Sequence, residues 1–336
     1  MKDYFVYVSL RDEDAIAIYK MDPVTGGLNF SEKQPVKGGP GSMNIDPEKK
    51  HLYVALRSIN SYAAFNVDHE TGKLTLIKTT PVVDNPVYNS TDLKGKFLLT
   101  AYYAGGKSAI YPIENDGSIS DNAVQAFTNF TNPHSILVDP TNRFVFMPDK
   151  GGDKIYQYKF DETTGMITPN DPAAFVTPAG TGPRHFLFCS EKNLVYLVNE
   201  LNGTITIYKL DQDKGTLSEI QNVSTLAADF SGVNTSADIH MTADKRFAYA
   251  TNRGPDNIAA FSVDEETGML KMISLYPTEK TPRSFNIDPH GQFLIVAGED
   301  SDNLAAYKIN KATGELEALS VIPVGKRPSW VLIEDF

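Results

Sequence analysis

Short apolar runs alternate with polar turns along the whole chain, and no stretch keeps the 3.6-residue spacing of an amphipathic helix. The runs are rich in β-branched and aromatic residues, as is typical of strands. One segment shows the pattern clearly, with strand-like runs at residues 42–45, 51–55, 62–67 and 74–77. This pattern predicts four antiparallel strands in one unit, which we name a to d.

The same unit recurs seven times. Aligning the glycine of the turn between strands c and d gives equivalent positions at Gly26, Gly72, Gly117, Gly165, Gly215, Gly268 and Gly314. Successive glycines are 45 to 53 residues apart. A repeat of this length indicates a solenoid or a propeller, and four short strands per repeat favour the blades of a propeller.

The two ends of the chain complement each other. The first repeat begins at a b-type strand, Tyr4 to Val8, and the chain ends in an a-type strand that starts at Pro328. Together they complete one blade and close the ring without an exposed edge. We therefore predict an all-β fold, a seven-bladed β-propeller of four antiparallel strands per blade, as one domain over residues 1–336.

Composition narrows the setting. The chain has 336 residues, a net charge of −11 and one cysteine. The charge argues against nucleic-acid binding, and no apolar run is long enough to span a membrane. With no signal-peptide pattern at the start and no possible internal disulfide, we expect a cytoplasmic location. A closed ring favours a monomer.

Two rings of residues meet on one face of the predicted propeller, at the mouth of its channel. The start of strand a contributes one ring, in which a Pro precedes Gly41, Val87, His134, Arg184, Arg283 and Ser329 and the sixth blade has residues 237–240 (Ala-Asp-Ile-His) instead. The end of strand b contributes the other: Arg11, Arg57, Tyr103, Lys150, Glu200, Arg253 and Glu299. Clustered cations repel one another, so these rings predict an anionic ligand, such as a phosphate or carboxylate held by arginine forks.

Three histidines, His134, His185 and His240, fall at or near the start of strand a on this face. Because side chains alternate along a strand, Arg184 and His185 are not both expected to face the channel. We expect Arg184 to face it and His185 to support it from between blades. Among these cations Glu200 should stay ionised, either as a base or in a salt bridge.

Motifs for cofactors are missing. The sequence has no Gly-x-Gly-x-x-Gly and no phosphate-binding P-loop, so we expect no nucleotide cofactor. Zinc-type spacing is also missing, and although Glu200 with His134 could hold a metal, we expect none. Cys189 lies within a predicted strand and is expected in the core.

Several segments resemble the propeller-type 6-phosphogluconolactonase family. The motifs that carry the resemblance are residues 182–185 (Gly-Pro-Arg-His), 198–202 (Val-Asn-Glu-Leu-Asn), 237–240 (Ala-Asp-Ile-His), 251–253 (Thr-Asn-Arg) and 281–288. The resemblance implies the seven-bladed fold and hydrolysis of 6-phosphogluconolactone to 6-phosphogluconate, in the pentose phosphate pathway and without a cofactor. A related branch, the fungal carboxy-muconate lactonizing enzymes, has a His, an Arg and a Glu that align with His134, Arg184 and Glu200, and a second Arg that aligns with Arg253.

The residues and the resemblance together give a predicted mechanism for hydrolysis of a phosphorylated sugar lactone, without a metal. Glu200 or His134 would take a proton from the attacking water, and Arg184 would stabilise the oxyanion. The predicted substrate-binding residues are Arg253, Arg283, His185, His240 and Lys150. Of these, Arg283 and Arg253, with Lys150, are expected to hold the phosphate and to steer the dianion in. The expected partner is a small anionic sugar lactone.

Two alternatives stay open. The same cations would suit a muconate-type lactonizing cycloisomerase that holds carboxylates. A non-catalytic propeller that binds an anion or a partner protein is the other alternative, because propellers host many unrelated functions.

Overall fold

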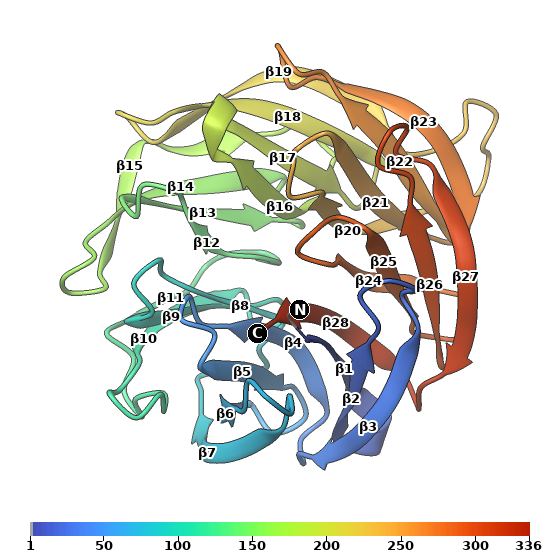
Figure 1. Cartoon of the computed structure of the whole chain (residues 1–336). Helices are drawn as coiled ribbons and strands as arrows, with labels where there is room; N and C mark the ends of the chain where they lie inside the picture. Colours follow the sequence, from blue (N-terminus) through green and yellow to red (C-terminus); the bar gives the residue numbers. More distant parts are fainter. Residues whose placement is uncertain (1–2) are drawn as a thin grey trace.

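The structure, a computed structural model that describes residues 3–336, has seven four-stranded antiparallel sheets arranged around a central channel (Figure 1). The predicted seven-bladed β-propeller is confirmed. Besides strands there are two short 3₁₀ turns, Arg11–Glu13 and Ser190–Lys192. Within residues 3–336, no helix has the length and apolar character needed to cross a membrane.

The blades follow chain order, each with strands a to d from the channel outward. Blade 1 comprises β28 (Pro328–Asp335), β1 (Tyr4–Leu10), β2 (Ala15–Met21) and β3 (Leu28–Pro35). Blade 2 comprises β4 (Pro40–Ile45), β5 (His51–Leu56), β6 (Ser61–Val67) and β7 (Leu74–Pro81). Blade 3 comprises β8 (Tyr88–Thr91), β9 (Phe97–Tyr102), β10 (Lys107–Pro112) and β11 (Gln125–Phe127).

Blades 4 to 7 continue the same order. Blade 4 comprises β12 (Leu137–Val138), β13 (Phe144–Asp149), β14 (Lys154–Phe160) and β15 (Ile167–Val176), and blade 5 comprises β16 (Pro183–Cys189), β17 (Leu194–Asn199), β18 (Thr204–Asp211) and β19 (Thr216–Ser224). Blade 6 comprises β20 (Thr235–Met241), β21 (Phe247–Arg253), β22 (Asn257–Val263) and β23 (Leu270–Pro277). Blade 7 comprises β24 (Pro282–Ile287), β25 (Phe293–Gly298), β26 (Asn303–Ile309) and β27 (Leu316–Pro323).

The chain termini close the ring as predicted. Strand β1 pairs antiparallel with β28, from Tyr4 opposite Asp335 to Leu10 opposite Pro328. The C-terminal strand is therefore strand a of blade 1, and the last strand to be made completes the first blade. No described blade is left without its inner strand.

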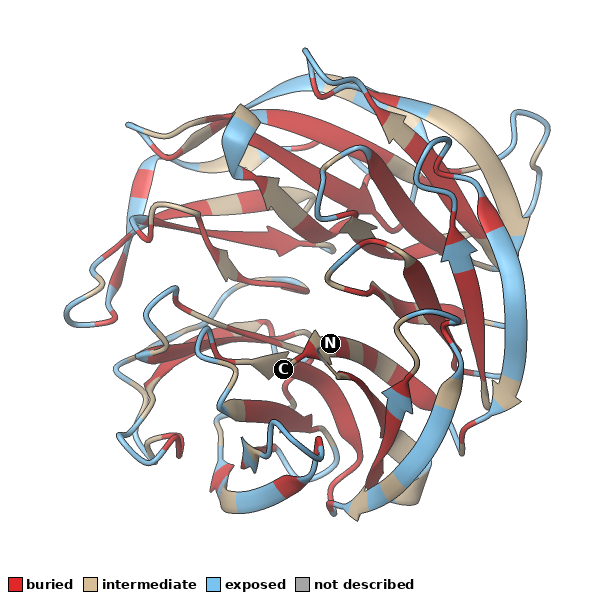
Figure 2. Cartoon of the chain, in the orientation of Figure 1, coloured by how far each residue is buried: buried red, intermediate tan, exposed pale blue. Residues whose placement is uncertain are grey.

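Burial falls from the channel side toward the rim (Figure 2). Every residue of β1 is buried, whereas most of the outer strand β27 is exposed. Strand b is buried on both sides because neighbouring blades pack face to face; Phe5 and Tyr7 of blade 1, for example, share a cluster with Leu52 and Phe65 of blade 2. The core is thus a ring of apolar layers between blades.

The repeated turn glycine packs against the preceding blade. Gly72 has φ +70°, and a Cβ there would lie 2.2 Å from Cδ1 of Phe5 in the preceding blade. The hydroxyl of Tyr7 donates a hydrogen bond to the Gly72 carbonyl at 2.9 Å. Only glycine fits this backbone conformation and this close approach, which explains why the turn repeats so regularly in the sequence.

A β-bulge interrupts strand a at the mouth of the channel in several blades. The register with strand b shifts between Pro183 and His185, and again between Pro282 and Ser284. A bulge inserts one extra residue and re-aims its side chain. In these two blades the extra residue is Arg184 or Arg283, so the bulges set the direction of two predicted site residues.

Candidate active site

Two adjoining hollows open at the predicted mouth. The larger has a volume of about 260 Å³ and is lined by Arg57, Val87, Tyr103, His134, Glu200, Arg253 and Arg283. Beside it lies a narrow hollow lined by Gly41, Ser42, Arg57, Val87, His134, Arg184, His185, Arg283, Ser329 and Trp330. Of the eight predicted site residues, these hollows bring together His134, Arg184, His185, Glu200, Arg253 and Arg283.

Glu200 forms the centre of one ionic cluster. It directly follows β17, and its carboxylate lies 2.9 Å from Arg184 Nε, 3.0 Å from Lys150 Nζ and 3.4 Å from Arg253 Nη2. Burial by itself would raise the pKa of Glu200, but the charges of Arg184, Arg253 and Lys150 outweigh it and lower the pKa to about 2. Glu200 is therefore ionised at neutral pH, as predicted, and both of its oxygens are held by cations.

Arg184 is almost entirely enclosed, with 1% of its surface exposed. Its Nε is bound to Glu200 and its Nη1 donates to the Ala237 carbonyl, while Nη2 has no hydrogen-bond partner within residues 3–336. Burial, followed by the charge of Arg253, lowers the pKa of Arg184 to about 9, which leaves it protonated at neutral pH. The guanidinium is thus fixed in place with one nitrogen still available.

His134 lines both hollows. It is 6% exposed, and its ring makes edge contacts with Tyr103 and His185 at centroid distances of 5.4 and 5.0 Å. No described residue forms a hydrogen bond with the imidazole, and its buried Nδ1 is unpaired. Burial and then the nearby charge of Arg184 hold the pKa of His134 well below its usual value. At neutral pH it is an uncharged imidazole with a free lone pair.

His185 is also at the hollow, so the expectation that it lies away from the channel while Arg184 faces it is wrong. The bulge at Arg184 breaks the alternation on which that expectation was based. His185 Nδ1 lies 2.8 Å from the buried carboxylate of Asp238. Burial and the charge of Arg184 lower the pKa of His185 to about 4, so a neutral imidazole donates Nδ1–H to Asp238.

Two predicted substrate-binding residues do not line either hollow. His240 lies 3.5 Å from Asp238 and packs edge-on against Phe285 at 4.8 Å. Lys150 Nζ is 3.0 Å from the Tyr103 hydroxyl as well as from Glu200. Tyr103 and Glu200 line the larger hollow, so Lys150 reaches the site through them. His240 is one residue further away, because its partner Asp238 in turn holds His185.

A second ionic cluster lies on the other side of the mouth, around Glu299. Its carboxylate is 3.1 Å from Arg11 Nη2, 3.6 Å from Arg283 Nη1 and 3.6 Å from Arg327 Nη2. These three cations are more exposed than those around Glu200; the Arg327 side chain is 45% exposed, against 2% for Arg184. The mouth therefore has a tightly enclosed side and a more open side.

Arg57 and Tyr103 line the larger hollow but were not selected as site residues from the sequence. Both occupy the ring at the end of strand b, where Glu200 and Arg253 also stand. Position in that ring was therefore the signal that could have identified them.

The described part of the chain contains no group of three or more His, Cys, Asp or Glu side chains arranged to hold a metal ion. Cys189 is a free, buried residue, as expected for the core.

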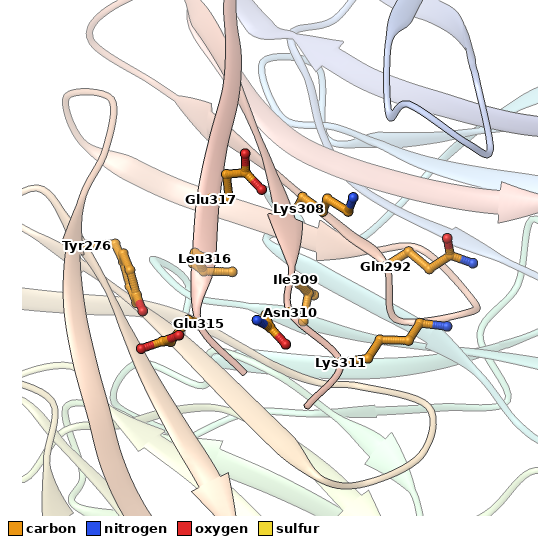
Figure 3. Close-up of a pocket in the computed structure, with 9 residues that line it drawn as sticks. All are labelled: Tyr276, Gln292, Lys308, Ile309, Asn310, Lys311, Glu315, Leu316 and Glu317. Carbon is orange, nitrogen blue, oxygen red and sulfur yellow. The ribbon is translucent and has the colours of Figure 1, made fainter. Parts of the chain in front are cut away.

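A hollow of about 660 Å³ lies elsewhere, beside the turn between β26 and β27 (Figure 3). Its lining mixes Lys308, Lys311 and Glu315 with Tyr276 and has no histidine. A hollow of about 520 Å³ also lies beside the end of β14, which is likewise a strand c. The hollow in Figure 3 shares no lining residue with the two hollows at the mouth of the channel.

Comparison with known proteins agrees with this geometry. Residues 1–88 and 82–333 match the family described as lactonase, 7-bladed beta-propeller. The chain belongs to this lactonase propeller family.

Two curated relatives of this lactonase propeller share one name. A 6-phosphogluconolactonase from Yersinia pestis (strain Pestoides F) is 33% identical over 294 residues, which is 88% of this chain and 87% of the relative. The protein of that name from Serratia proteamaculans is 36% identical over 203 residues, 60% of this chain and 61% of the relative. The chain thus spans about three-fifths of the length of that relative.

Solved structures share the fold over nearly the whole chain. A periplasmic gluconolactonase from Pseudomonas aeruginosa superposes with a TM-score of 0.93 at 26% identity, covering 98% of this chain and 99% of that one. A candidate 6-phosphogluconolactonase from Bacteroides fragilis gives a TM-score of 0.91 at 26% identity, covering 99% and 98%. One of these names includes a phosphorylated sugar and the other does not.

Proposed function

We propose that this lactonase propeller hydrolyses a phosphorylated sugar lactone, 6-phosphogluconolactone, to 6-phosphogluconate. The observation that carries the proposal is the unpartnered, neutral imidazole of His134, which lines the hollow of about 260 Å³ and also the adjoining narrow hollow of about 10 Å³ where Arg184 lies. Lactone hydrolysis is accelerated by a base that activates water and by a positive charge that stabilises the oxyanion. The names of the curated relatives supply the substrate.

In this mechanism His134 is the base. It takes a proton from a water molecule that attacks the lactone carbonyl carbon, and Arg184 Nη2 donates to the resulting oxyanion. The tetrahedral intermediate then collapses, the ring C–O bond breaks, and the protonated His134 returns its proton to the leaving ring oxygen. The product is an open-chain hydroxy acid, which releases the remaining proton to solvent and becomes the hydroxy-carboxylate.

Glu200 has a positioning role in this account. Its oxygens are already engaged by Arg184, Lys150 and Arg253, whereas the buried Nδ1 of His134 has no hydrogen-bond partner within residues 3–336. Of the two bases predicted from the sequence, the geometry favours His134. Glu200 fixes the direction of Arg184 and offsets part of the positive charge.

The test is the hydrolysis of freshly generated 6-phosphogluconolactone, followed against its spontaneous rate, with gluconolactone and an Arg283→Ala variant as comparisons. We expect acceleration by the wild type and weaker binding of the phosphorylated lactone by the variant, because Arg283 lines both hollows. No acceleration by a folded protein would contradict the proposal, and activity on a muconate instead would favour the cycloisomerase.

The proposal places this reaction in the cytoplasm, with a monomeric enzyme that uses no metal or cofactor. Sedimentation would test the oligomeric state, and turnover after treatment with a chelator would test the metal requirement.

A further inference from the structure

We propose that Arg57 is the anchor of an anion subsite that receives the phosphate of the substrate, on the side of the mouth opposite Glu200. The inference rests on the proposed function and adds an orientation to it. The phosphate would lie by Arg57 and Arg283, and the lactone ring by His134, Arg184 and Arg253.

The first observation is the pairing of charges. The arginines and the lysine that surround the mouth have carboxylate partners within 4 Å, with one exception: Lys150, Arg184 and Arg253 pair with Glu200, and Arg11, Arg283 and Arg327 pair with Glu299. Arg57 has no carboxylate partner within residues 3–336. Its one side-chain hydrogen bond runs from Nε to the amide oxygen of Asn85, at 3.1 Å.

The second observation is position. Arg57 lines the 260 Å³ hollow, the narrow hollow and a third hollow of about 460 Å³ that it shares with Arg11, Asn85 and Ser58. It therefore stands where three hollows meet. The hydrogen bond to Asn85 orients the guanidinium through Nε, and among residues 3–336 neither Nη group has a hydrogen-bond partner. A guanidinium with two free nitrogens matches two phosphate oxygens.

The third observation is the electrostatic setting. Burial, then the charges of Arg283 and Arg11, lower the pKa of Arg57 to about 10, and Glu299 acts in the opposite direction. Arg57 thus remains protonated at neutral pH and bears an uncompensated charge next to two further arginines. A dianionic phosphate would relieve that repulsion.

The lactone end fits the other side of the mouth. Arg184, Arg253 and Lys150 are already committed to Glu200, so they offer less charge to a dianion than Arg57 does. Arg283 completes the phosphate subsite, because it lines the same two hollows as Arg57 and its contact with Glu299 is long, at 3.6 Å.

The experiment compares kcat/KM for 6-phosphogluconolactone and for gluconolactone in the wild type, Arg57→Gln, Arg57→Lys and Arg246→Gln. Arg246 is an exposed arginine in the turn between β20 and β21, bound to the Lys311 carbonyl at 2.9 Å, and serves as the matched control. We expect Arg57→Gln to lower kcat/KM for the phosphorylated lactone by about 10- to 100-fold and that for gluconolactone much less. Arg57→Lys keeps the charge but loses the two Nη groups, so its kcat/KM for the phosphorylated lactone should lie between that of the wild type and that of Arg57→Gln.

Binding of inorganic phosphate to each protein, measured by calorimetry, gives a readout that does not depend on activity. Phosphate that binds the wild type and Arg246→Gln, but not Arg57→Gln, supports the subsite even if the lactone proves to be the wrong substrate. Equal loss of activity on both lactones, or phosphate binding unchanged in a folded Arg57→Gln, would overturn the inference while leaving lactone hydrolysis intact.

Discussion

The two carboxylates at the mouth differ in what surrounds them. Glu200 holds a guanidinium that is 2% exposed, whereas the cations around Glu299 are 22% to 45% exposed and lie up to 3.6 Å away. A buried ion pair is held in one geometry and is costly to break, but partly solvated pairs exchange readily with water. The Glu200 side therefore suits the reacting carbonyl, which needs fixed charges, and the Glu299 side suits a charged substituent that has to enter and leave.

Replacing each carboxylate in turn should give the largest difference in stability between the two sides. Glu200→Gln leaves the buried Arg184 without its partner, so we expect a loss of about 3–5 kcal/mol in the free energy of unfolding. Glu299→Gln leaves cations that water can reach, and we expect a loss of about 1 kcal/mol. Chemical denaturation of both variants measures the difference, and equal losses would mean that the two sides do not differ in rigidity.

Arg184→Lys tests whether the enclosed side does the chemistry. The lysine keeps a positive charge beside Glu200 but cannot reproduce the guanidinium nitrogens, so turnover should fall by on the order of 10²–10³-fold. Circular dichroism verifies the fold, and Arg246→Lys on an exposed turn is the matched control. Turnover close to that of the wild type would remove Arg184 from the oxyanion role.

Acid should weaken the enclosed side of the mouth. Because the pKa of Glu200 is depressed to about 2 in the folded protein, its ionised form stabilises the fold above the unfolded pKa of about 4.3. This stabilisation, about 3 kcal/mol, is lost as the pH falls toward 2. The difference in unfolding free energy between the wild type and Glu200→Gln should therefore shrink over that range, and a constant difference would refute the depressed pKa.

The sequence was sufficient to predict the blades and the closure of the ring. The glycine turns repeat because each glycine has to fit against the neighbouring blade, so their spacing reports the fold directly. The candidate site was predicted less completely, because bulges and charge pairing are tertiary features. A strict alternation of side chains along the strand does not predict the bulge that brings His185 to the hollow. Arg57 differs from Arg253 in its partners, and those partners come from other blades.

The most direct test of the account is the turnover of 6-phosphogluconolactone by His134→Asn beside His69→Asn. His69 is an exposed histidine in the turn between β6 and β7, bound to the Lys49 carbonyl at 2.8 Å. If His134 is the base, its replacement lowers kcat by roughly 10²–10⁴-fold in a protein that keeps its fold, and His69→Asn retains wild-type turnover. Wild-type turnover in a folded His134→Asn would contradict the central claim.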